Sequence, residues 1–221
     1  MWLKVEAELA NRFPDLKALI AYVHEVTVQK ENLELEEFKQ SVIQDLKSHY
    51  SLDSIKEQPI FRACRDFYWR IGIDPTKTRP SAEALLRRVV AGKPFPRINT
   101  VVDAYNLASA STGIAIGAFD YSKIEGDLLL RSARPGERFR GIGMQEPEIL
   151  KGNEPVVSDS KKLIAIYPYR DSDETKVTEK TKEVLLLICG VPGIPEEKLQ
   201  YAAELTIDYI TRFCGGKGEL P

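Results

Sequence analysis

The side chains that most often carry covalent enzyme chemistry are scarce in this sequence of 221 residues. It contains two histidines and three cysteines: His24, His49, Cys64, Cys189 and Cys214. No Cys-x-x-Cys pair and no Gly-x-Ser-x-Gly elbow occurs, which argues against a cysteine-rich zinc site and against a serine–histidine hydrolase. Because an odd number of separated cysteines suits a reducing compartment, we expect three buried apolar thiols.

Nucleotide and metal chemistry also find little support. The sequence has no Walker-A or Gly-x-Gly-x-x-Gly pattern, and Gly141-Ile142-Gly143 is typical of a turn. Acidic groups at 34–37 and 171–174 could bind a hard cation, but they are more typical of a solvated helix face and a polar loop. We therefore expect no metal ion and no cofactor.

A basic segment between residues 61 and 97 interrupts a chain whose net charge is −2. Nine Lys or Arg residues stand there against three acidic ones, Asp66, Asp74 and Glu83. The segment could form a local patch that faces phosphates. Alternatively, some of the arginines pair with acidic neighbours or coat a solvated helix face. In either case the segment is not basic enough for tight non-specific binding of nucleic acid.

The elements that must position any site alternate between helical and extended patterns. Apolar residues three and four apart predict helices at 33–49, 61–71, 81–91, 99–107 and 196–214. We expect Ser81 to cap the third of these, with Glu83 in its first turn. Apolar β-forming runs predict strands at 16–28, 114–119, 127–131, 155–157, 163–167 and 184–189. The sequence thus predicts an α+β fold, a central sheet region flanked by helices at both ends.

Short matches to one family follow one another in order along residues 60–190. They include RPSAEALLRR at 79–88, INTVVDAYNL at 98–107, GAFD at 117–120, RDS at 170–172 and TKVT at 175–178. Each match is weak alone, but their order is specific. The chain resembles the B3/B4 domain, the editing part of the phenylalanyl-tRNA synthetase beta subunit, in a free-standing form.

This resemblance implies one B3/B4-like domain over residues 1–221, with its matched core at 60–190. Residues 1–55 would add an N-terminal strand and helix, and residues 195–214 the C-terminal helix. The longest apolar stretch, 184–189, is too short to cross a bilayer, and acidic residues interrupt the N-terminus. We therefore expect neither a membrane anchor nor a signal peptide, and a cytoplasmic protein.

The family's chemistry is hydrolysis of the ester between a misattached amino acid and the 3′-terminal ribose of tRNA. This reaction needs a positioned water and a shaped pocket, and it does not require a charged catalytic dyad. The implied partner is the 3′ end of an aminoacyl-tRNA. A non-catalytic module that binds tRNA or a free amino acid with the same fold is the alternative. A third reading is a fold-only relative that acts on an unrelated small molecule.

The resemblance also implies site residues. An Asp-x-x-Asn pattern assigns Asp103 and Asn106, with Asn106 as a neutral donor that could stabilise an oxyanion. The aspartate that follows phenylalanine in the pattern is Asp120. A helix boundary would explain the first two residues equally well, and an Asx-turn would explain Asp120.

Two pocket positions depart from the family pattern. Gly117 stands where synthetase-linked members have histidine, and Leu187 stands where they have glutamate. In those members the two residues help to recognise the hydroxyl of tyrosine. The glycine pair before the serine that matches Ser172 is replaced by Pro168-Tyr169. Because the side chain of leucine cannot form a hydrogen bond with a hydroxyl group, we expect a substrate side chain other than that of tyrosine.

The densest polar stretch near the matched region is the loop 170–178. We expect five of its residues to line the mouth of the pocket and meet the end of the tRNA: Arg170, Ser172, Thr175, Lys176 and Thr178. The alternative is a surface turn whose polar groups bond one another.

Overall fold

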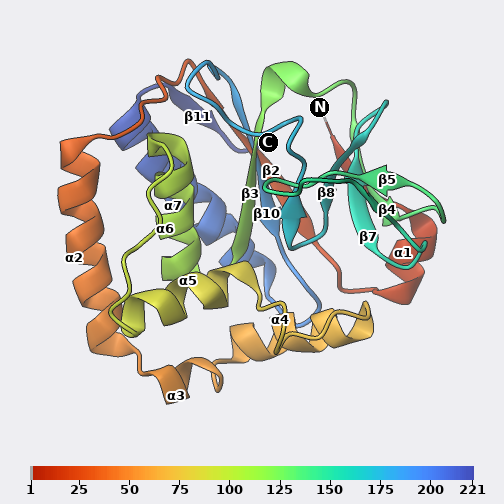
Figure 1. Cartoon of the computed structure of the whole chain (residues 1–221), viewed down its shortest axis with the longest axis horizontal. Coiled ribbons are helices and arrows are strands. Elements are labelled where there is room, and N and C mark those ends of the chain that lie inside the picture. The colour runs from red at the N-terminus through yellow and green to blue at the C-terminus, as the bar shows by residue number, and fades with distance from the viewer. Residues whose placement is uncertain (1) are drawn as a thin grey trace.

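Two β-sheets stand beside each other in the computed structural model, which describes residues 2–221 (Figure 1). The larger sheet has the order β1-β4-β7-β8-β9, with bounds Leu3–Val5, Leu128–Ser132, Pro155–Ser158, Leu163–Ile166 and Arg170–Asp171. The smaller has the order β11-β2-β10-β3, with bounds Lys217–Glu219, Ala18–His24, Val184–Cys189 and Ala115–Asp120. A separate ribbon pairs β5 (Arg138–Phe139) with β6 (Glu148–Ile149).

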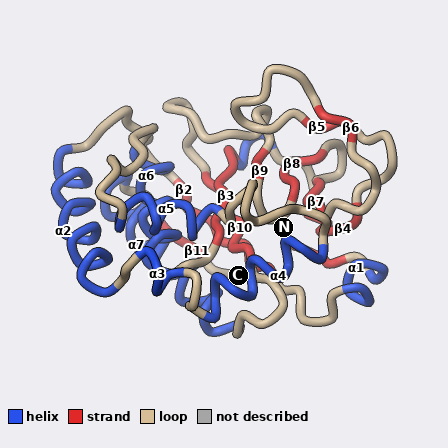
Figure 2. The backbone as a smooth tube through the Cα atoms, turned by 60° about the horizontal axis from the view of Figure 1, so that its bottom comes forward, coloured by secondary structure: helices blue, strands red, loops and turns tan. Residues whose placement is uncertain are grey.

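The long helices gather on the side of the smaller sheet, while the larger sheet lies on the other side (Figures 1 and 2). Helices α6 and α7 pack against each other and against β3 and β2. The helices in chain order are α1 (Ala7–Arg12), α2 (Leu33–His49), α3 (Leu52–Ile55), α4 (Pro59–Arg70), α5 (Ser81–Val90), α6 (Thr100–Thr112) and α7 (Glu196–Cys214), with a 3₁₀ turn at Tyr121–Lys123. The predicted α+β fold is confirmed.

Strand β10 explains why the sheet region is so apolar. All six of its residues, VLLLIC, are buried, because the strand lies between β2 and β3 and is covered on both faces. Such a strand reads as a continuous apolar run rather than an alternating one. Its register places Leu187 directly opposite Gly117 of β3 and Ile20 of β2.

Several predicted elements have shifted ends. The strand predicted at 16–28 is β2, which stops at His24 because Glu25 has a φ of 59°, which an extended strand cannot continue. Helix α6 runs beyond residue 107 and ends at Gly113, where φ is 74°. The prediction that Ser81 caps α5 is wrong: Pro80 is the N-cap residue, Ser81 is the first helical residue, and no side-chain capping bond forms.

The three cysteines are buried free thiols, as expected. Within residues 2–221, no helix is both long enough and apolar enough to cross a membrane.

Candidate functional site

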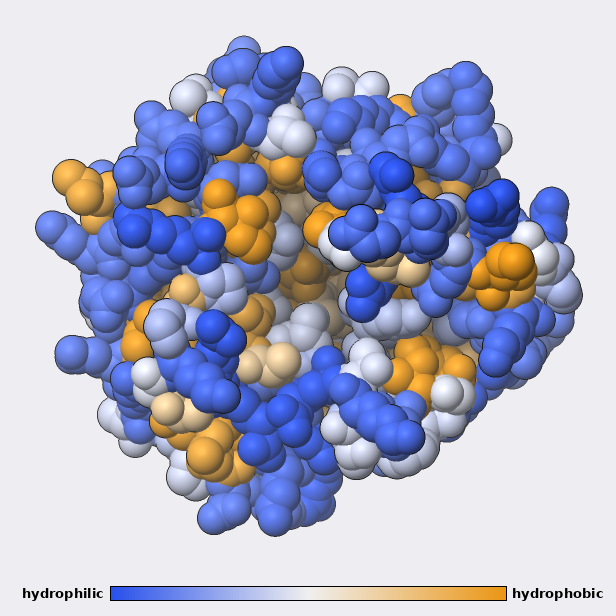
Figure 3. Space-filling view, in the orientation of Figure 1, coloured by the Kyte–Doolittle hydropathy of each residue, from blue (hydrophilic) through white to orange (hydrophobic). Residues whose placement is uncertain are grey.

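A cavity of about 140 Å³ lies where the two sheets approach each other. Strands β3 and β9, each at the edge of its own sheet, form part of its wall together with α6, β10 and the segment 165–169. The space-filling view shows this face hollowed near its middle, with apolar surface inside and a hydrophilic rim (Figure 3). The pocket is therefore assembled from segments that are far apart in the sequence.

The paired strands β3 and β10 bring two of the predicted residues together. Gly117 and Leu187 are direct cross-strand partners, and both line the cavity. Leu187 is buried. A Cβ atom at position 117 would lie 2.9 Å from Oδ1 and 3.2 Å from Oδ2 of Asp171. The carboxyl group of Asp171 on β9 therefore occupies the space that a side chain at 117 would need.

Helix α6 positions Asn106 on the cavity wall. The helix starts at Asn99, whose side chain accepts a hydrogen bond of 3.0 Å from the N–H of Val102. One turn beyond Asn106, the hydroxyl of Ser109 is used internally, donating to the carbonyl of Ile114 at 2.6 Å. The side-chain amide of Asn106 has no hydrogen-bond partner among residues 2–221, so its donor and acceptor groups both remain available to a ligand.

Asp171 is the carboxyl group of this pocket, and it was not among the residues predicted from the sequence. Burial raises its pKa to about 7, although a hydrogen bond from the backbone N–H of Ala118 acts in the opposite direction. Burial also raises the pKa of the Tyr105 phenol and the Cys189 thiol, and the nearby Asp171 charge adds to both shifts. Both groups therefore stay protonated at neutral pH. The available sequence signal was the position of Asp171 inside the matched Arg170-Asp171-Ser172 run.

Two predicted residues, Asp103 and Asp120, do not line the cavity. Asp103 accepts a 2.9 Å ion-pair contact from Nζ of Lys39, both side chains being buried, and a 2.8 Å hydrogen bond from the N–H of Ile98. Asp120 accepts hydrogen bonds from the N–H of Ser122 at 3.2 Å and the hydroxyl of Thr181 at 2.8 Å. These contacts are those of a helix boundary and a turn.

Only one of the five predicted loop residues, Arg170, lines the cavity. The hydroxyl of Ser172 accepts a hydrogen bond from a backbone N–H of its own loop at 3.2 Å, and Nζ of Lys176 forms a 2.7 Å ion pair within the loop. Thr175 is fully buried, and the N–H of Thr178 donates to a hydroxyl three residues on. Contact of these four residues with tRNA stays a prediction.

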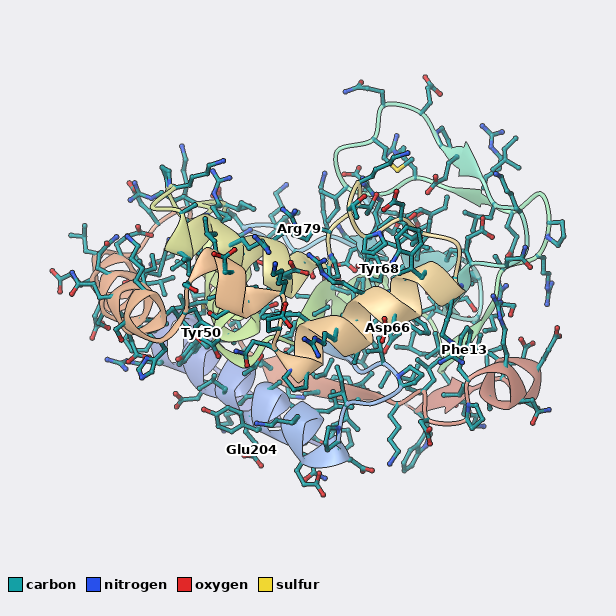
Figure 4. The ribbon with its side chains drawn as sticks, turned by 90° about the horizontal axis from the view of Figure 1, so that it is seen from below. Phe13, Tyr50, Asp66, Tyr68, Arg79 and Glu204 are labelled. Atoms are coloured by element: carbon teal, nitrogen blue, oxygen red, sulfur yellow. The ribbon has the colours of Figure 1, made fainter. Side chains whose placement is uncertain are left out.

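A second, larger hollow of about 570 Å³ runs along α5 and shares Ser81 and Asn106 with the pocket. Four cationic side chains line this hollow, which we call the basic groove: Arg79, Arg87, Arg88 and Lys93. Figure 4 shows Arg79 beside α5 on the underside of the molecule. Part of the basic segment 61–97 is thus gathered next to the pocket.

Glu83, fully buried on α5, holds part of this groove in place. It accepts hydrogen bonds of 2.6 and 2.8 Å from Arg65 and one of 2.8 Å from Arg87, and Arg79 lies 3.7 Å away. Burial alone would raise the pKa of Glu83, but the bonds from Arg65 and Arg87 outweigh it and hold the pKa below its ordinary value. One carboxylate thus faces three arginines, and the groove keeps a positive excess. Pairing of arginines with an acidic neighbour is therefore confirmed for part of the basic segment, and a role of the remaining cations in facing phosphates stays a prediction.

Helix α4 reaches the pocket wall through Tyr68. Figure 4 shows Tyr68 and Asp66 on opposite sides of this helix. The Tyr68 ring meets Tyr169, a cavity residue, edge-on at 6.4 Å, and its hydroxyl is buried without a hydrogen-bond partner in the described chain. Phe61, Phe67 and Tyr68 of this helix belong to the core, whereas Trp69 is exposed. No group of three or more His, Cys, Asp or Glu side chains within residues 2–221 could hold a metal ion.

Comparison with known proteins agrees with this fold. The family model of the B3/4 domain matches residues 63–215. The chain belongs to the B3/4 domain family. Its similarity to the phenylalanine–tRNA ligase beta subunit of Symbiobacterium thermophilum is 28% identity over 141 residues, covering 63% of this chain and 16% of that one. With the beta subunit of Aquifex aeolicus it shares 36% identity over 89 residues, 40% of this chain and 11% of the relative.

A solved structure shows the same fold. The N-terminal fragment of the phenylalanyl-tRNA synthetase beta subunit from Pyrococcus horikoshii aligns with 98% of this chain and 50% of its own, with a TM-score of 0.55 and 17% identity. The chain spans 16% and 11% of the two ligase beta subunits named above, and thus only a small part of the relatives that it matches.

Proposed function

We propose that this B3/4 domain hydrolyses the ester bond of a mischarged aminoacyl-tRNA in trans. The observation that carries the proposal is the junction at Ser81 and Asn106, where the recessed pocket meets the basic groove. A pocket for an aminoacyl group beside cations for phosphates is the arrangement that the 3′ end of a charged tRNA requires. The family relation to synthetase beta subunits supports this choice of substrate.

The chemistry needs one water and one donor. The water oxygen bonds to the ester carbon, the bond from that carbon to the ribose oxygen breaks, and the ribose oxygen takes up one of the two protons of that water. During this step negative charge develops on the carbonyl oxygen. In this proposal the side-chain amide of Asn106, which lines both the pocket and the basic groove, donates to that oxygen, a role for which a neutral group suffices.

The test is loss of the ester bond from a panel of correctly and wrongly charged tRNAs. We expect rapid release from one mischarged species, and a rate about 100-fold lower for Asn106→Ala, the usual cost of removing one oxyanion donor. Asn153→Ala, at an exposed position outside the pocket, is the matched control and should retain the full rate. A full rate in Asn106→Ala would remove this residue from the mechanism.

A second candidate function is a binding module without turnover. It is favoured by the pair Gly117 and Leu187, which leaves no polar group at these two facing positions. Saturable binding of charged tRNA with no ester loss from any species would select it over the deacylase.

The compartment and the extent of the working unit follow from the same proposal. We propose that residues 1–221 act as one domain on cytoplasmic aminoacyl-tRNA, and the three buried free thiols support a reducing compartment.

A further inference from the structure

The carboxyl group of Asp171 is an unmatched acceptor. Its one hydrogen bond comes from the backbone N–H of Ala118, and no ion pair reaches it from any cationic side chain in residues 2–221. The adjacent Arg170 turns elsewhere: its guanidinium lies 3.5 Å from the carbonyl of Ile142 and over the ring of Tyr169. Keeping a carboxylate charged in a recess costs free energy when no cation lies beside it, and a cationic ligand would remove that cost.

The surroundings of Asp171 narrow the chemistry of that ligand. On β3 the carboxyl lies against Gly117 and Ala118, and on β8 Asp171 pairs with Ala165, and none of these three residues is titratable. Across the pocket stand the Tyr105 phenol on α6 and the Cys189 thiol on β10, both protonated at neutral pH. Tyr167 and Tyr169 also line the cavity, and burial raises the pKa of both phenols, so they stay protonated as well. The walls thus carry one carboxyl group and one cation, Arg170, whose guanidinium is directed to Ile142 and Tyr169.

The size of the recess limits the ligand further. A cavity of about 150 Å³ takes a molecule of the size of benzene, and this pocket measures about 140 Å³. A hydrated metal ion would need further oxygen or nitrogen ligands, and such a cluster is missing from the described chain. A compact organic cation fits both the charge and the volume.

We propose that Asp171 is the acceptor for the α-ammonium group of a small aminoacyl moiety seated in this pocket. The proposal rests on the proposed function, because it takes the aminoacyl end of tRNA as the ligand. The carboxylate on β9 would hold the ammonium group over Gly117, while Asn106 faces the ester at the mouth. Histidine at position 117 would collide with this carboxyl, so the glycine and the aspartate form one arrangement.

Binding of small ligands tests this without tRNA and without turnover. The probes are L-amino alcohols with side chains from methyl to isobutyl, each paired with its N-acetyl derivative, titrated into the full chain by calorimetry. We expect the amino alcohols to bind more tightly than their acetylated partners. Asp171→Asn, which keeps shape and the bond from Ala118, should reduce that preference by about 10-fold or more. Asp173→Asn, in the same loop but outside the cavity, should leave it unchanged.

The pH dependence gives a second readout on the wild-type protein. The empty pocket holds the pKa of Asp171 at about 7, so affinity for an amino alcohol should rise as pH rises through about 7 and then level off. Below that pH, binding should release a proton, seen as a dependence of the measured heat on the ionisation enthalpy of the buffer. Asp171→Asn should lose both effects.

Three results would overturn the inference: no binding of any amino alcohol, equal binding of the acetylated partners, or a preference that persists in Asp171→Asn. If Asp171→Asn keeps the preference for free amino alcohols but no longer hydrolyses the ester of charged tRNA, the carboxyl group acts on the attacking water instead of on the ammonium group. Conversely, the wild-type protein could prefer free amino alcohols and yet release no amino acid from any tRNA. That result would exclude the deacylase function and would still support recognition of the ammonium group by Asp171.

Discussion

Gly117 matters for the space it leaves, which the carboxyl group of Asp171 fills at a distance that would be too close for a Cβ atom. Because burial places the folded-state pKa of Asp171 above its ordinary value of 3.8, ionising it costs folding stability as pH rises from about 4 to about 7. A bound cation offsets that cost. Near neutral pH the folded protein is thus more stable with a cation bound in the pocket than with the pocket empty.

Gly117→Ala should therefore weaken the binding of amino alcohols by about 10-fold while the protein still folds. The added methyl group pushes the carboxyl away from its place over β3, and overpacking of this kind costs on the order of 1 kcal/mol of stability. Calorimetric titration and urea unfolding measure the two effects.

A double-mutant cycle shows whether the two residues act together. If Gly117→Ala works by displacing the carboxyl, it should have little further effect on ammonium preference in the Asp171→Asn background. Additive losses would instead mean that the methyl group blocks the ligand directly.

At the level of elements, a buried ion pair ties α2 to α6, the helix that presents Asn106. Nζ of Lys39 lies 2.9 Å from Oδ2 of Asp103 and 2.7 Å from Glu36. Removing one partner from such a pair leaves an uncompensated buried charge. Asp103 therefore contributes to the position of the pocket wall from outside it.

We expect Asp103→Asn to lower the free energy of unfolding by about 3 kcal/mol in urea titrations. Asp45→Asn, which removes an exposed charge from α2, the helix that carries Lys39, should cause no measurable change. If Asp103→Asn retains stability but loses affinity for charged tRNA, the residue contacts the ligand, as the family pattern suggested.

The sequence predicted the elements well where their pattern was periodic or continuous, as in α2, α7 and β10. It could not predict β9, whose two residues form a strand only because β8 is alongside. For the same reason Asp171 was missed: its place over Gly117 depends on two sheet edges meeting, a contact between distant segments. Asn106, Gly117 and Leu187, which line the cavity, were named from the sequence because they occupy positions of a family pattern. Such a pattern reflects a shared fold and therefore includes contacts between distant segments.

For the whole molecule, the pocket and the basic groove lie side by side on a chain whose net charge is −2. A local cationic strip of this kind orients an anionic partner while the remaining surface does not attract it. Phosphate contacts along the groove should then set affinity, and the pocket should set which amino acid is accepted.

Arg88→Ala and Lys93→Ala should each weaken binding of tRNA and lower the slope of log affinity against log salt concentration by about one. Fluorescence anisotropy at several salt concentrations measures this. Lys198→Ala, an exposed charge on α7, is the control. Amino alcohol binding should be unchanged in all three variants, and an unaltered slope in both groove variants would exclude the groove as the phosphate path.

Glu83 has a further consequence for that path. An unrestrained arginine gives up about 2 kcal/mol of side-chain rotamer entropy when a ligand fixes it. Nε of Arg87 lies 2.8 Å and Nε of Arg79 lies 3.7 Å from Oε1 of Glu83. Part of the loss of side-chain entropy of these two arginines therefore occurs on folding, before a ligand binds. A phosphate that enters the groove meets guanidinium groups already arranged, and its association should be less opposed by entropy than docking onto free surface lysines.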